Sequence, residues 1–320
     1  MQAYRVSSFE TSPHLETITP PQPHMGEVGI KIKACGLNFA DILMQDGTYQ
    51  DTPTPPFTLG MEVAGVVDAL GPDTDGPAPG TRVAVFGGQG GLAEMGCFDV
   101  NRCVVIPDTM SFQDAAAFQI AYGTSHVALE YRAKLQAGET LLVLGAAGGV
   151  GLTAVELGKL MGARVIAVAR GAEKLAIAKQ AGADHVIDAT QDDLLAQLKA
   201  LGGIDVVYDP VGGDQFKAAF RACRPEARII VIGFASGSVP QIPANHLLVK
   251  NITVEGFYWG GYLKFKPHVI TDSLAKLTGW YQEGKLTPHI SATFPLAEAQ
   301  KGIDLLKARK STGKVVITID

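Results

Sequence analysis

Residues 140–170 constrain the fold of this chain most, because they contain two apolar runs joined by a glycine-rich turn and a helical segment. Residues 141–145 and, after Arg164, residues 165–169 are apolar or β-branched, over a length that is typical of buried parallel strands. The Ala- and Leu-rich segment between them predicts a helix that ends near residue 161. This succession of strand, turn, helix and strand is the core unit of α/β domains that bind dinucleotides.

The turn itself carries Gly145, Gly148 and Gly151 at three-residue intervals. A pyrophosphate must approach the backbone of such a turn closely, and a Cβ would obstruct it. The helix that begins near Gly149 offers unpaired N–H groups and the positive end of its dipole to the same pyrophosphate. The spacing G-x-x-G-x-x-G differs from the commoner G-x-G-x-x-G, and the alternative is a turn that only packs the helix on the sheet. The expected cofactor contacts in this turn are Ala147, Gly148, Gly149 and Val150.

The residues after the second strand indicate which dinucleotide is bound. An NAD site needs a carboxylate at the end of that strand to accept hydrogen bonds from the ribose 2′-hydroxyl group, but the chain has Ala169 there. Arg170 and Lys174 follow, and charge-assisted hydrogen bonds from such side chains stabilise a 2′-phosphate by about 1.5–3 kcal/mol each. The alternative is that both residues are the solvated start of a helix. The pattern therefore predicts NADPH as the cofactor, with Arg170 and Lys174 at its extra phosphate.

Composition limits the remaining possibilities. With 320 residues the chain is longer than one typical domain, and 47% hydrophobic against 18% charged residues are typical of a well-buried globular protein. The net charge of −5 gives no reason to expect nucleic acid or an anionic membrane as a partner. No apolar run has the length of a signal-peptide core or a membrane span, and the cysteines are scattered without a framework, so we expect a cytoplasmic protein. These cysteines are Cys35, Cys97, Cys103 and Cys223.

The first 121 residues are expected to be mainly β. Short apolar runs alternate with Pro- and Gly-rich turns, which is typical of a compact, barrel-like domain. The expected strands cover residues 4–9, 27–33, 61–70, 82–86 and 103–106, with a turn or two of helix over 38–45. Residues 111–131 then have a helical pattern that starts with Ser111 and Asp114 in the spacing of a capping box. We place the crossing into the nucleotide-binding domain in this region.

Strands and helices alternate from residue 141 onward, and the number of strands is that of a complete doubly wound sheet. The expected strands are residues 141–145, 164–169, 185–188, 204–208, 227–232 and 252–257, and the expected helices 149–161, 172–181, 190–200 and 213–222. Ligands of such sheets bind beyond the carboxyl ends of the strands, so the loops after the fourth and fifth strands are expected to contact the cofactor. The alternative for each glycine-rich loop is a plain turn. The expected contacts are Val211, Gly233, Phe234 and Ala235.

The C-terminal part of the chain contains three further elements. Residues 267–283 and 296–310 have the pattern of amphipathic helices, and residues 314–319 have that of a strand. This last strand has no place in a six-stranded nucleotide-binding sheet. We therefore expect it to return to the first domain.

Several short motifs together resemble the medium-chain dehydrogenase/reductases, and within them the zinc-free quinone oxidoreductase branch of the zeta-crystallin type. They are residues 36–41 (GLNFAD), 47–49 (GTY), 60–65 (GMEVAG), 147–151 (AGGVG) and 182–184 (GAD). The resemblance covers nearly the whole chain. It implies an α/β fold in which a six-stranded, doubly wound Rossmann domain, residues 122–263, is inserted into a GroES-like β-barrel catalytic domain, residues 1–121 and 264–320. It also implies a homodimer joined edge to edge through the strand near residues 252–257.

The chain departs from the zinc-dependent members of that family at the metal positions. Their first catalytic ligand, a Cys, matches Asn38, their His ligand matches Met61, and their third ligand, a Cys, would fall near Ile120. The four closely spaced cysteines of their structural zinc site are also missing, since only Cys97 and Cys103 lie in that region. Zinc needs three or four N, S or O ligands in a tight cluster, so we expect no metal.

The resemblance implies hydride transfer from NADPH to a quinone or an α,β-unsaturated carbonyl compound. A hydride added to such a conjugated acceptor moves charge to a remote oxygen, so positioning and a few hydrogen-bond donors suffice without a metal. The family position implies Tyr49 as a donor on the substrate side, and Asn38 as an amide that donates to the substrate oxygen or positions the nicotinamide. The alternatives are a half-buried packing role for Tyr49 and a loop-capping role for Asn38. Asp41 is expected to be structural and paired with a backbone group.

Three more residues are implied at the cofactor. Thr124 lies at the nicotinamide by family position, and the alternative is a helix hydroxyl bonded to its own backbone. Phe257 ends the expected sixth strand and Tyr258 follows it, and both are expected to line the cofactor pocket, although an interface role is equally open for Tyr258. No histidine is paired with an acid in a recognisable pattern, so His126 and the others receive no catalytic role.

Two other functions compete with this interpretation. An enoyl-thioester reductase of the acryloyl- or crotonyl-CoA type would need basic residues for the CoA phosphates, and Lys250, Lys264 and Lys266 form the local cluster. The other is a non-catalytic NADPH-binding protein with a structural or RNA-binding role, as in some zeta-crystallin relatives. The negative net charge and the lack of an aromatic and basic stripe argue against RNA binding. The presence of Asn38 and Tyr49 argues against an inactive site.

Overall fold

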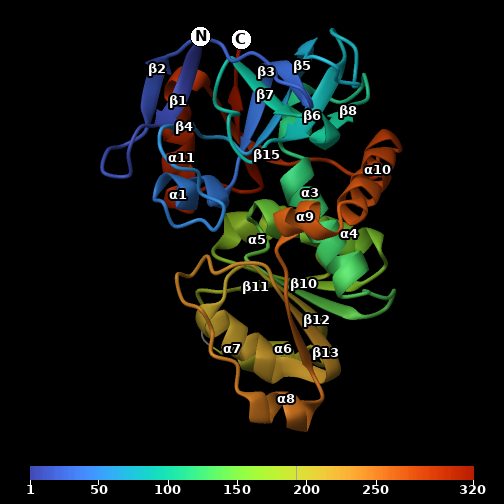
Figure 1. Cartoon of the computed structure of the whole chain (residues 1–320). Helices are drawn as coiled ribbons and strands as arrows, with labels where there is room; N and C mark the ends of the chain where they lie inside the picture. The colour runs from blue at the N-terminus through green and yellow to red at the C-terminus, as the bar shows by residue number, and fades with distance from the viewer. Residues whose placement is uncertain (192) are drawn as a thin grey trace. The chain divides into compact units, whose positions relative to one another are not determined.

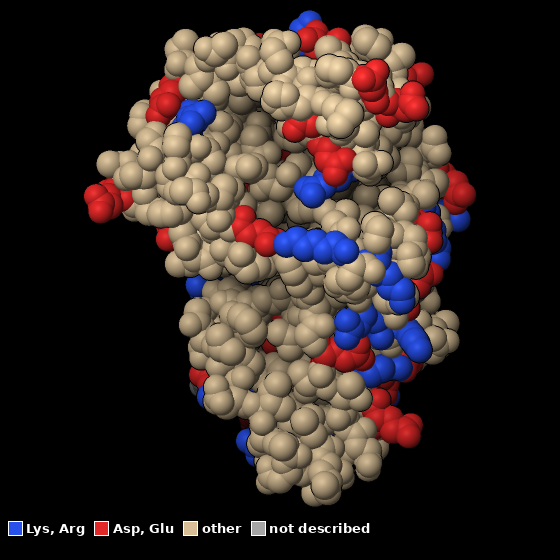
Figure 2. Space-filling model, viewed as in Figure 1, with Lys and Arg blue, Asp and Glu red and all other residues tan. Residues whose placement is uncertain are grey.

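The computed structural model describes residues 1–191 and 193–320, which form two compact units (Figure 1). The terminal unit comprises Met1–Ile120 and Thr287–Asp320, and the central unit comprises Ala121–Leu286. Acidic and basic side chains are interspersed on the visible face rather than separated by sign (Figure 2). This distribution agrees with the small net charge of −5.

The central unit is built on a six-stranded parallel sheet with the order β11-β10-β9-β12-β13-β14. Its strands are β9 (Thr140–Leu144), β10 (Arg164–Ala169), β11 (His185–Asp188), β12 (Ile204–Asp209), β13 (Cys223–Val231) and β14 (Thr253–Gly256). All six predicted strands are confirmed within a few residues. The direction of the strand order reverses between β9 and β12. In doubly wound sheets, ligands bind at such a reversal, in the crevice beyond the carboxyl ends of the strands.

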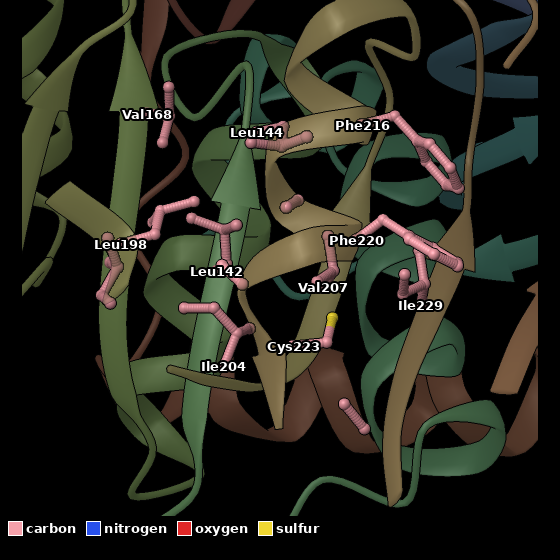
Figure 3. Packing of buried hydrophobic residues seen from close by; sticks show 14 of the residues in the cluster. Leu142, Leu144, Val168, Leu198, Ile204, Val207, Phe216, Phe220, Cys223 and Ile229 are labelled. Carbon is pink, nitrogen blue, oxygen red and sulfur yellow. The ribbon is translucent and has the colours of Figure 1, made fainter. Parts of the chain in front are cut away.

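Helices cover both faces of this sheet. They are α4 (Gly149–Leu160) and α5 (Ala172–Gln180), which lie on one side in Figure 1, and α6 (Leu194–Ala200) and α7 (Gly213–Ala222), which lie on the other. Phe216 and Phe220 of α7 belong to one buried cluster with strand residues such as Leu142 and Ile229, and Phe220 lies beside Ile229 (Figure 3). The predicted helix over residues 190–200 begins only at Leu194. Asp192, which lies within that predicted range, is outside the described residues.

The boundary at the end of the central unit lies later in the chain than the sequence suggested. Helix α10 (His268–Gln282) belongs to the central unit, whereas the resemblance placed residues 264–320 in the other domain. Leu277 of α10 is fully buried, and the Ser273 hydroxyl lies 2.8 Å from Nδ1 of His126, a residue of α3 (Gln119–His126). These contacts hold α10 on the central unit. The α-helices between β13 and α10 are α8 (Ala244–Lys250) and α9 (Tyr262–Phe265).

The terminal unit contains a seven-stranded sheet and a three-stranded sheet. In the larger sheet the order is β15-β16-β3-β5-β6-β8, with β7 also paired to β3, and in the smaller sheet it is β2-β1-β4. The strands are β1 (Gln2–Val6), β2 (His14–Thr17), β3 (Glu27–Leu37), β4 (Phe57–Thr58), β5 (Glu62–Leu70), β6 (Arg82–Phe86), β7 (Met95–Asp99), β8 (Cys103–Val105), β15 (Ile290–Pro295) and β16 (Lys314–Thr318). Strand β16 pairs antiparallel with β3, so the predicted return of the last strand is confirmed.

Three helices accompany these sheets: α1 (Phe39–Gln45), α2 (Phe112–Ala116) and α11 (Ala299–Lys307). The predicted cap of the helical region is present, because the Ser111 hydroxyl accepts a hydrogen bond from the Asp114 N–H at 3.0 Å. Among the residues that the structure describes, no helix is both long and apolar enough to cross a bilayer.

Candidate functional site

The glycine turn of the central unit has the geometry that a pyrophosphate needs. Strand β9 is buried throughout, and Gly145 follows it with a φ of +58°, which lies in the left-handed region that favours glycine. A Cβ on Gly151 would lie 2.2 Å from the Gly145 carbonyl oxygen, so the first turn of α4 approaches the end of the strand very closely. Gly148 is exposed, and a Cβ there would meet only that same oxygen at 3.4 Å. The turn therefore presents accessible backbone at the N-terminus of a twelve-residue helix.

Two cations, Arg170 and Lys174, follow the end of β10. Ala169 is buried, Arg170 is exposed, and Gly171 leads into α5 with a φ of +84°. Lys174 is half-buried in the first turn of α5, and its pKa is lowered by burial and by the positive charge of Arg170. Two positive side chains this close in the chain are a favourable site for an anion such as a phosphate.

A carboxylate that sequence reasoning did not consider lies opposite Ala169. Asp188, the last residue of β11, is the register partner of Ala169. Its Oδ1 accepts hydrogen bonds from the Gly171 N–H at 3.2 Å and from the N–H and hydroxyl of Thr190 at 2.9 Å. These donors lower the pKa of Asp188. The carboxylate is thus occupied in shaping the two loops at the ends of β10 and β11.

The loops predicted to contact the cofactor are brought together at the carboxyl edge of the sheet. Asp209 ends β12, and its buried carboxylate accepts hydrogen bonds from the N–H groups of Val211 and Gly212 at 2.7 and 2.8 Å. The Ala235 N–H donates to the Pro210 carbonyl at 3.0 Å, which joins the loop after β13 to the loop after β12. A Cβ on Gly145 would lie 2.9 Å from the Val211 side chain. Val211 is therefore next to the glycine turn, and Gly233, Phe234 and Ala235 belong to the adjoining loop.

Helix α3 is fastened to the start of α4 by buried hydroxyl groups. The Ser125 hydroxyl lies 2.8 Å from the Val150 carbonyl oxygen, 2.8 Å from the Thr153 hydroxyl and 3.0 Å from the Tyr208 hydroxyl. Thr124, which the resemblance implied at the nicotinamide, is buried next to Ser125. This network holds the start of α4, where the glycine turn ends, against α3 and β12. The sequence did not reveal the network because its members come from three separate elements.

The residues after the sixth strand have mainly structural contacts. Phe257 is buried, its N–H donates to the Val231 carbonyl, and its ring packs 5.8 Å from the ring of Tyr262. Tyr258 is partly exposed beside it. Neither contact tests the prediction that Phe257 and Tyr258 line the cofactor pocket, which stays a prediction.

In the terminal unit, Asn38 and Tyr49 flank helix α1. Asn38 is half-buried between the end of β3 and the helix. Tyr49 is also half-buried, and its N–H donates to the Leu43 carbonyl at 3.2 Å, which holds the loop that follows α1. Asp41 is fully buried and accepts hydrogen bonds from the N–H groups of Asn38 and Gly60 at 2.8 and 3.2 Å. The prediction that Asp41 is structural and paired with the backbone is confirmed.

A buried ion pair lies directly behind Asn38. Glu62 and Lys314 are 1% and 5% exposed, and Lys314 Nζ lies 2.5 Å from Glu62 Oε1. The Lys314 ammonium also donates to Asn38 Oδ1 at 2.7 Å, and Asn38 Nδ2 donates to Glu62 Oε1 at 3.0 Å. The second oxygen of Glu62 accepts the Ile120 N–H at 2.9 Å. Sequence reasoning singled out neither charged residue as part of the site, although Glu62 stands within the GMEVAG motif.

Comparisons with known proteins agree with this two-part architecture. An alcohol dehydrogenase GroES-like domain matches residues 24–108, and a zinc-binding dehydrogenase domain matches residues 149–276. Quinone oxidoreductase-like protein 2 of Bos taurus is 40% identical over 311 residues, which cover 95% of this chain and 88% of that protein. The chain therefore belongs to the medium-chain dehydrogenase/reductase family, in its quinone oxidoreductase branch.

Two further proteins are similar to nearly the whole chain. The quinone oxidoreductase of Thermus thermophilus, described with its NADPH complex, superposes with a TM-score of 0.89 at 33% identity, covering 99% of this chain and all of the other. A human protein described as the synaptic vesicle membrane protein VAT-1 homolog is 31% identical over 316 residues, covering 93% of this chain and 80% of that protein. The predicted fold class, a GroES-like domain with a Rossmann-type domain, is confirmed by these matches and by the strand order.

The zinc that one family description implies does not fit the residues of this chain. By the family resemblance, two positions of the catalytic zinc ligands hold the amide of Asn38 and the buried thioether of Met61, and the third falls near the aliphatic Ile120. The Asn38 amide is already hydrogen-bonded to Lys314 and Glu62. The Lys314 ammonium group therefore lies at the Asn38 and Glu62 oxygen atoms, which a metal ion would need as ligands. Among the described residues, no three His, Cys, Asp or Glu side chains are grouped closely enough to hold a metal ion.

Proposed function

We propose that this chain is an NADPH-dependent reductase that transfers a hydride to a quinone or an α,β-unsaturated carbonyl compound without a metal. The observation that carries the proposal is the replacement of the zinc-ligand positions by Asn38, Met61 and Ile120 in a chain that has a complete nucleotide-binding unit. A simple ketone needs its carbonyl polarised strongly, which a metal ion does well. A conjugated acceptor spreads the arriving charge to a remote oxygen and needs only hydrogen-bond donors there.

The central unit supplies the residues that would hold NADPH. The backbone of Ala147, Gly148, Gly149 and Val150 would bind the pyrophosphate at the N-terminus of α4. Arg170 and Lys174 would bind the 2′-phosphate, and the description of the Thermus thermophilus relative with NADPH supports this choice. Val211 and the loop of Gly233, Phe234 and Ala235 would close the carboxyl edge, with Thr124, Phe257 and Tyr258 toward the nicotinamide. NADPH, when bound, supplies the hydride.

The terminal unit supplies the donors that would position the acceptor. The Tyr49 hydroxyl would donate to the substrate oxygen and so stabilise the negative charge that develops there. Asn38 would act as a second donor beside it. The test is the consumption of NADPH with a panel of benzoquinone, an enone and a simple ketone, for the wild type and for Tyr49→Phe. We expect turnover of the first two acceptors only, and a reduced kcat for Tyr49→Phe with unchanged NADPH affinity. Turnover of the simple ketone alone would contradict the proposal.

Reduction of an enoyl-CoA is the nearest competing function, and one contact weakens it. The Lys250 ammonium donates to the carbonyl oxygens of Phe220, Arg221 and Cys223 at 2.9–3.1 Å, so it ends helix α7 and is not available to a CoA phosphate. Lys266 is bonded to the Tyr131 hydroxyl at 2.8 Å. Turnover of crotonyl-CoA at a rate above that of benzoquinone would favour this alternative.

We also propose that the protein is a homodimer through the central unit. Strand β14 is the edge of the six-stranded sheet, and an open strand edge can pair with a second copy of itself. The segment before it is apolar and exposed at Val239, Ile242, Leu248 and Val249. The region of α8 carries few charged atoms on the visible face (Figure 2). A second chain would cover this apolar surface.

A further inference from the structure

The buried charges behind Asn38 have a consequence for the orientation of its side chain. A carboxamide has one edge that accepts hydrogen bonds and one that donates them, and the two are easily exchanged by rotation of the group. Lys314 can only donate, and ionised Glu62 can only accept. The Asn38 oxygen must therefore face Lys314, at 2.7 Å, and its nitrogen must face Glu62, at 3.0 Å. The ion pair selects one of the two orientations.

Burying Glu62 and Lys314 costs free energy, which suggests that the orientation they impose on the Asn38 side chain serves the function of the protein. Removing two charges from water is expensive, and a buried ion pair is often no more stabilising than apolar residues of the same volume. Both side chains are almost completely buried, and the pair joins β5 to β16, which are far apart in the chain. Asp41 fixes the backbone of the same residue by accepting its N–H at 2.8 Å. The backbone and side chain of Asn38 are thus held by three charged residues.

One N–H group of Asn38 remains weakly engaged. The Asn38 nitrogen donates to Glu62 at 3.0 Å and to the Gly36 carbonyl oxygen at 3.3 Å. The second distance is beyond the usual range of an N–H to oxygen hydrogen bond, so this contact is weak. The amide is at the same time polarised by the ammonium on its oxygen, which strengthens its N–H groups as donors. The weakly engaged donor is the one that a ligand oxygen can take over.

We propose that Lys314 and Glu62 are positioning residues that hold the Asn38 carboxamide so that one N–H donates to the carbonyl oxygen of the acceptor. The inference rests on the proposed function. In this proposal, a buried lysine and a buried glutamate orient one neutral hydrogen-bond donor. The zinc-dependent relatives use a metal ion at the same position. Asn38 is the catalytic residue, and Lys314 and Glu62 act through it.

The first experiment is a double-mutant cycle. Lys314→Met with Glu62→Gln removes both members of the ion pair together, so that neither is left without the other. Asn38→Ala removes the donor itself. We expect each change to lower kcat with a quinone by about 10-fold to 100-fold, and to leave the dissociation constant of NADPH unchanged. We also expect the triple variant to be no slower than Asn38→Ala, because all three residues act through one group.

A matched control comes from an exposed ion pair in the same unit. Lys31 Nζ lies 2.6 Å from Asp68 Oδ1, and the lysine side chain is 60% exposed. Lys31→Met with Asp68→Asn removes the same number of charges from the same sheet and should leave kcat unchanged. Losses that multiply in the triple variant would mean that Lys314 and Glu62 act independently of Asn38, and would overturn the inference.

A second readout does not depend on turnover. In a nitrogen-15 spectrum of the cofactor-free protein, the side-chain amide signals of Asn38 can be assigned by their loss in Asn38→Asp. We expect two well-separated, slowly exchanging proton signals in the wild type, and rapidly exchanging signals after Lys314→Met with Glu62→Gln. Unchanged exchange in that variant would overturn the positioning role. A wild type that consumes no NADPH with any acceptor would defeat the proposed function instead, and the amide signals would still decide whether the ion pair orients Asn38.

Discussion

Buried carboxylates hold the loops of both units through backbone N–H groups. Asp41 accepts the N–H groups of Asn38 and Gly60, and Asp209 accepts those of Val211 and Gly212. Each is 1% exposed. Burial raises the pKa of both carboxyl groups, and the hydrogen bonds act in the opposite direction. The protonation of such residues therefore couples loop structure to pH.

Asp41 provides a pH-dependent prediction. Burial raises its pKa from 3.8 to about 7, with a contribution from Glu62 and an opposing one from Lys314. A raised pKa means that the folded protein holds the proton more tightly than the unfolded chain, so this stabilisation is fully present below pH 3.8 and lost as the pH rises through about 7. The wild type should therefore lose stability relative to Asp41→Asn between these values, by about 1.4 kcal/mol for each pKa unit.

The measurement is urea unfolding of both proteins at several pH values. Above pH 7 the difference between them should become constant, because Asp41 is then ionised in the folded and the unfolded states. Parallel pH profiles for the two proteins over the whole range would show that the Asp41 pKa is not raised.

The proposed contact between Arg170 and the 2′-phosphate gives a second prediction at the scale of single residues. Arg170→Ala should weaken NADPH binding by about tenfold, equivalent to about 1.4 kcal/mol, and leave NADH binding almost unchanged, because only NADPH carries the 2′-phosphate. Fluorescence titration with each nucleotide measures both constants. Arg221→Ala, which removes an exposed arginine from α7, is the control. Equal losses for the two nucleotides would mean that Arg170 does not contact the phosphate.

At the scale of elements, we expect different glycines of the turn to matter for stability and for cofactor binding. A Cβ on Gly151 would lie 2.2 Å from the Gly145 carbonyl oxygen, whereas a Cβ on Gly148 would lie at an ordinary 3.4 Å from it. Gly151→Ala should therefore destabilise the central unit by about 1–3 kcal/mol. Gly148→Ala should leave the melting temperature nearly unchanged but weaken NADPH binding on the order of tenfold or more, because its methyl group occupies the approach of the pyrophosphate.

Differential scanning calorimetry and nucleotide titration of the two variants check this pair. Gly279→Ala serves as the control, because a Cβ there would meet no atom within 4 Å and its φ is not positive. If Gly148→Ala bound NADPH as tightly as the wild type, the pyrophosphate would not lie at this turn.

The strands of the central unit were predictable because buried parallel strands are continuous apolar runs. Strands β2, β4, β7 and β15 escaped prediction for the opposite reason. His14–Thr17 is almost fully exposed, Phe57–Thr58 has only two residues, and Ile290–Pro295 has no fully buried residue. Such strands exist because a neighbouring strand offers hydrogen bonds, and a sequence window contains no information about that neighbour.

The candidate site shows the same division between local and distant information. The glycine turn and the pair Arg170 and Lys174 are local patterns, and the structure places them at the start of adjacent helices. The ion pair of Glu62 and Lys314 joins residues that are 252 positions apart. Nothing near Lys314 distinguishes it from a surface lysine at the start of a strand. Only the fold reveals that its ammonium is buried against a carboxylate.

At the scale of the whole molecule, α8 tests the proposed dimer. Leu248 and Val249 are 77% and 74% exposed on this short helix, which leads into the amino end of the edge strand β14. Exposed apolar residues beside an open strand edge are typical of an interface between subunits. Replacing both with lysine should place four positive charges in the interface of a twofold dimer and shift the protein toward the monomer mass of 33.7 kDa.

Light scattering after gel filtration measures this mass for the wild type, the Leu248→Lys/Val249→Lys variant and a Val105→Lys control, which charges an exposed valine of the terminal unit. The control should keep the mass of the wild type. The double variant should still bind NADPH, because the glycine turn lies at the carboxyl ends of the strands whereas α8 leads into the amino end of β14. A monomeric wild type would contradict the proposed dimer. A double variant that stays dimeric would show that the contact between the two copies lies elsewhere.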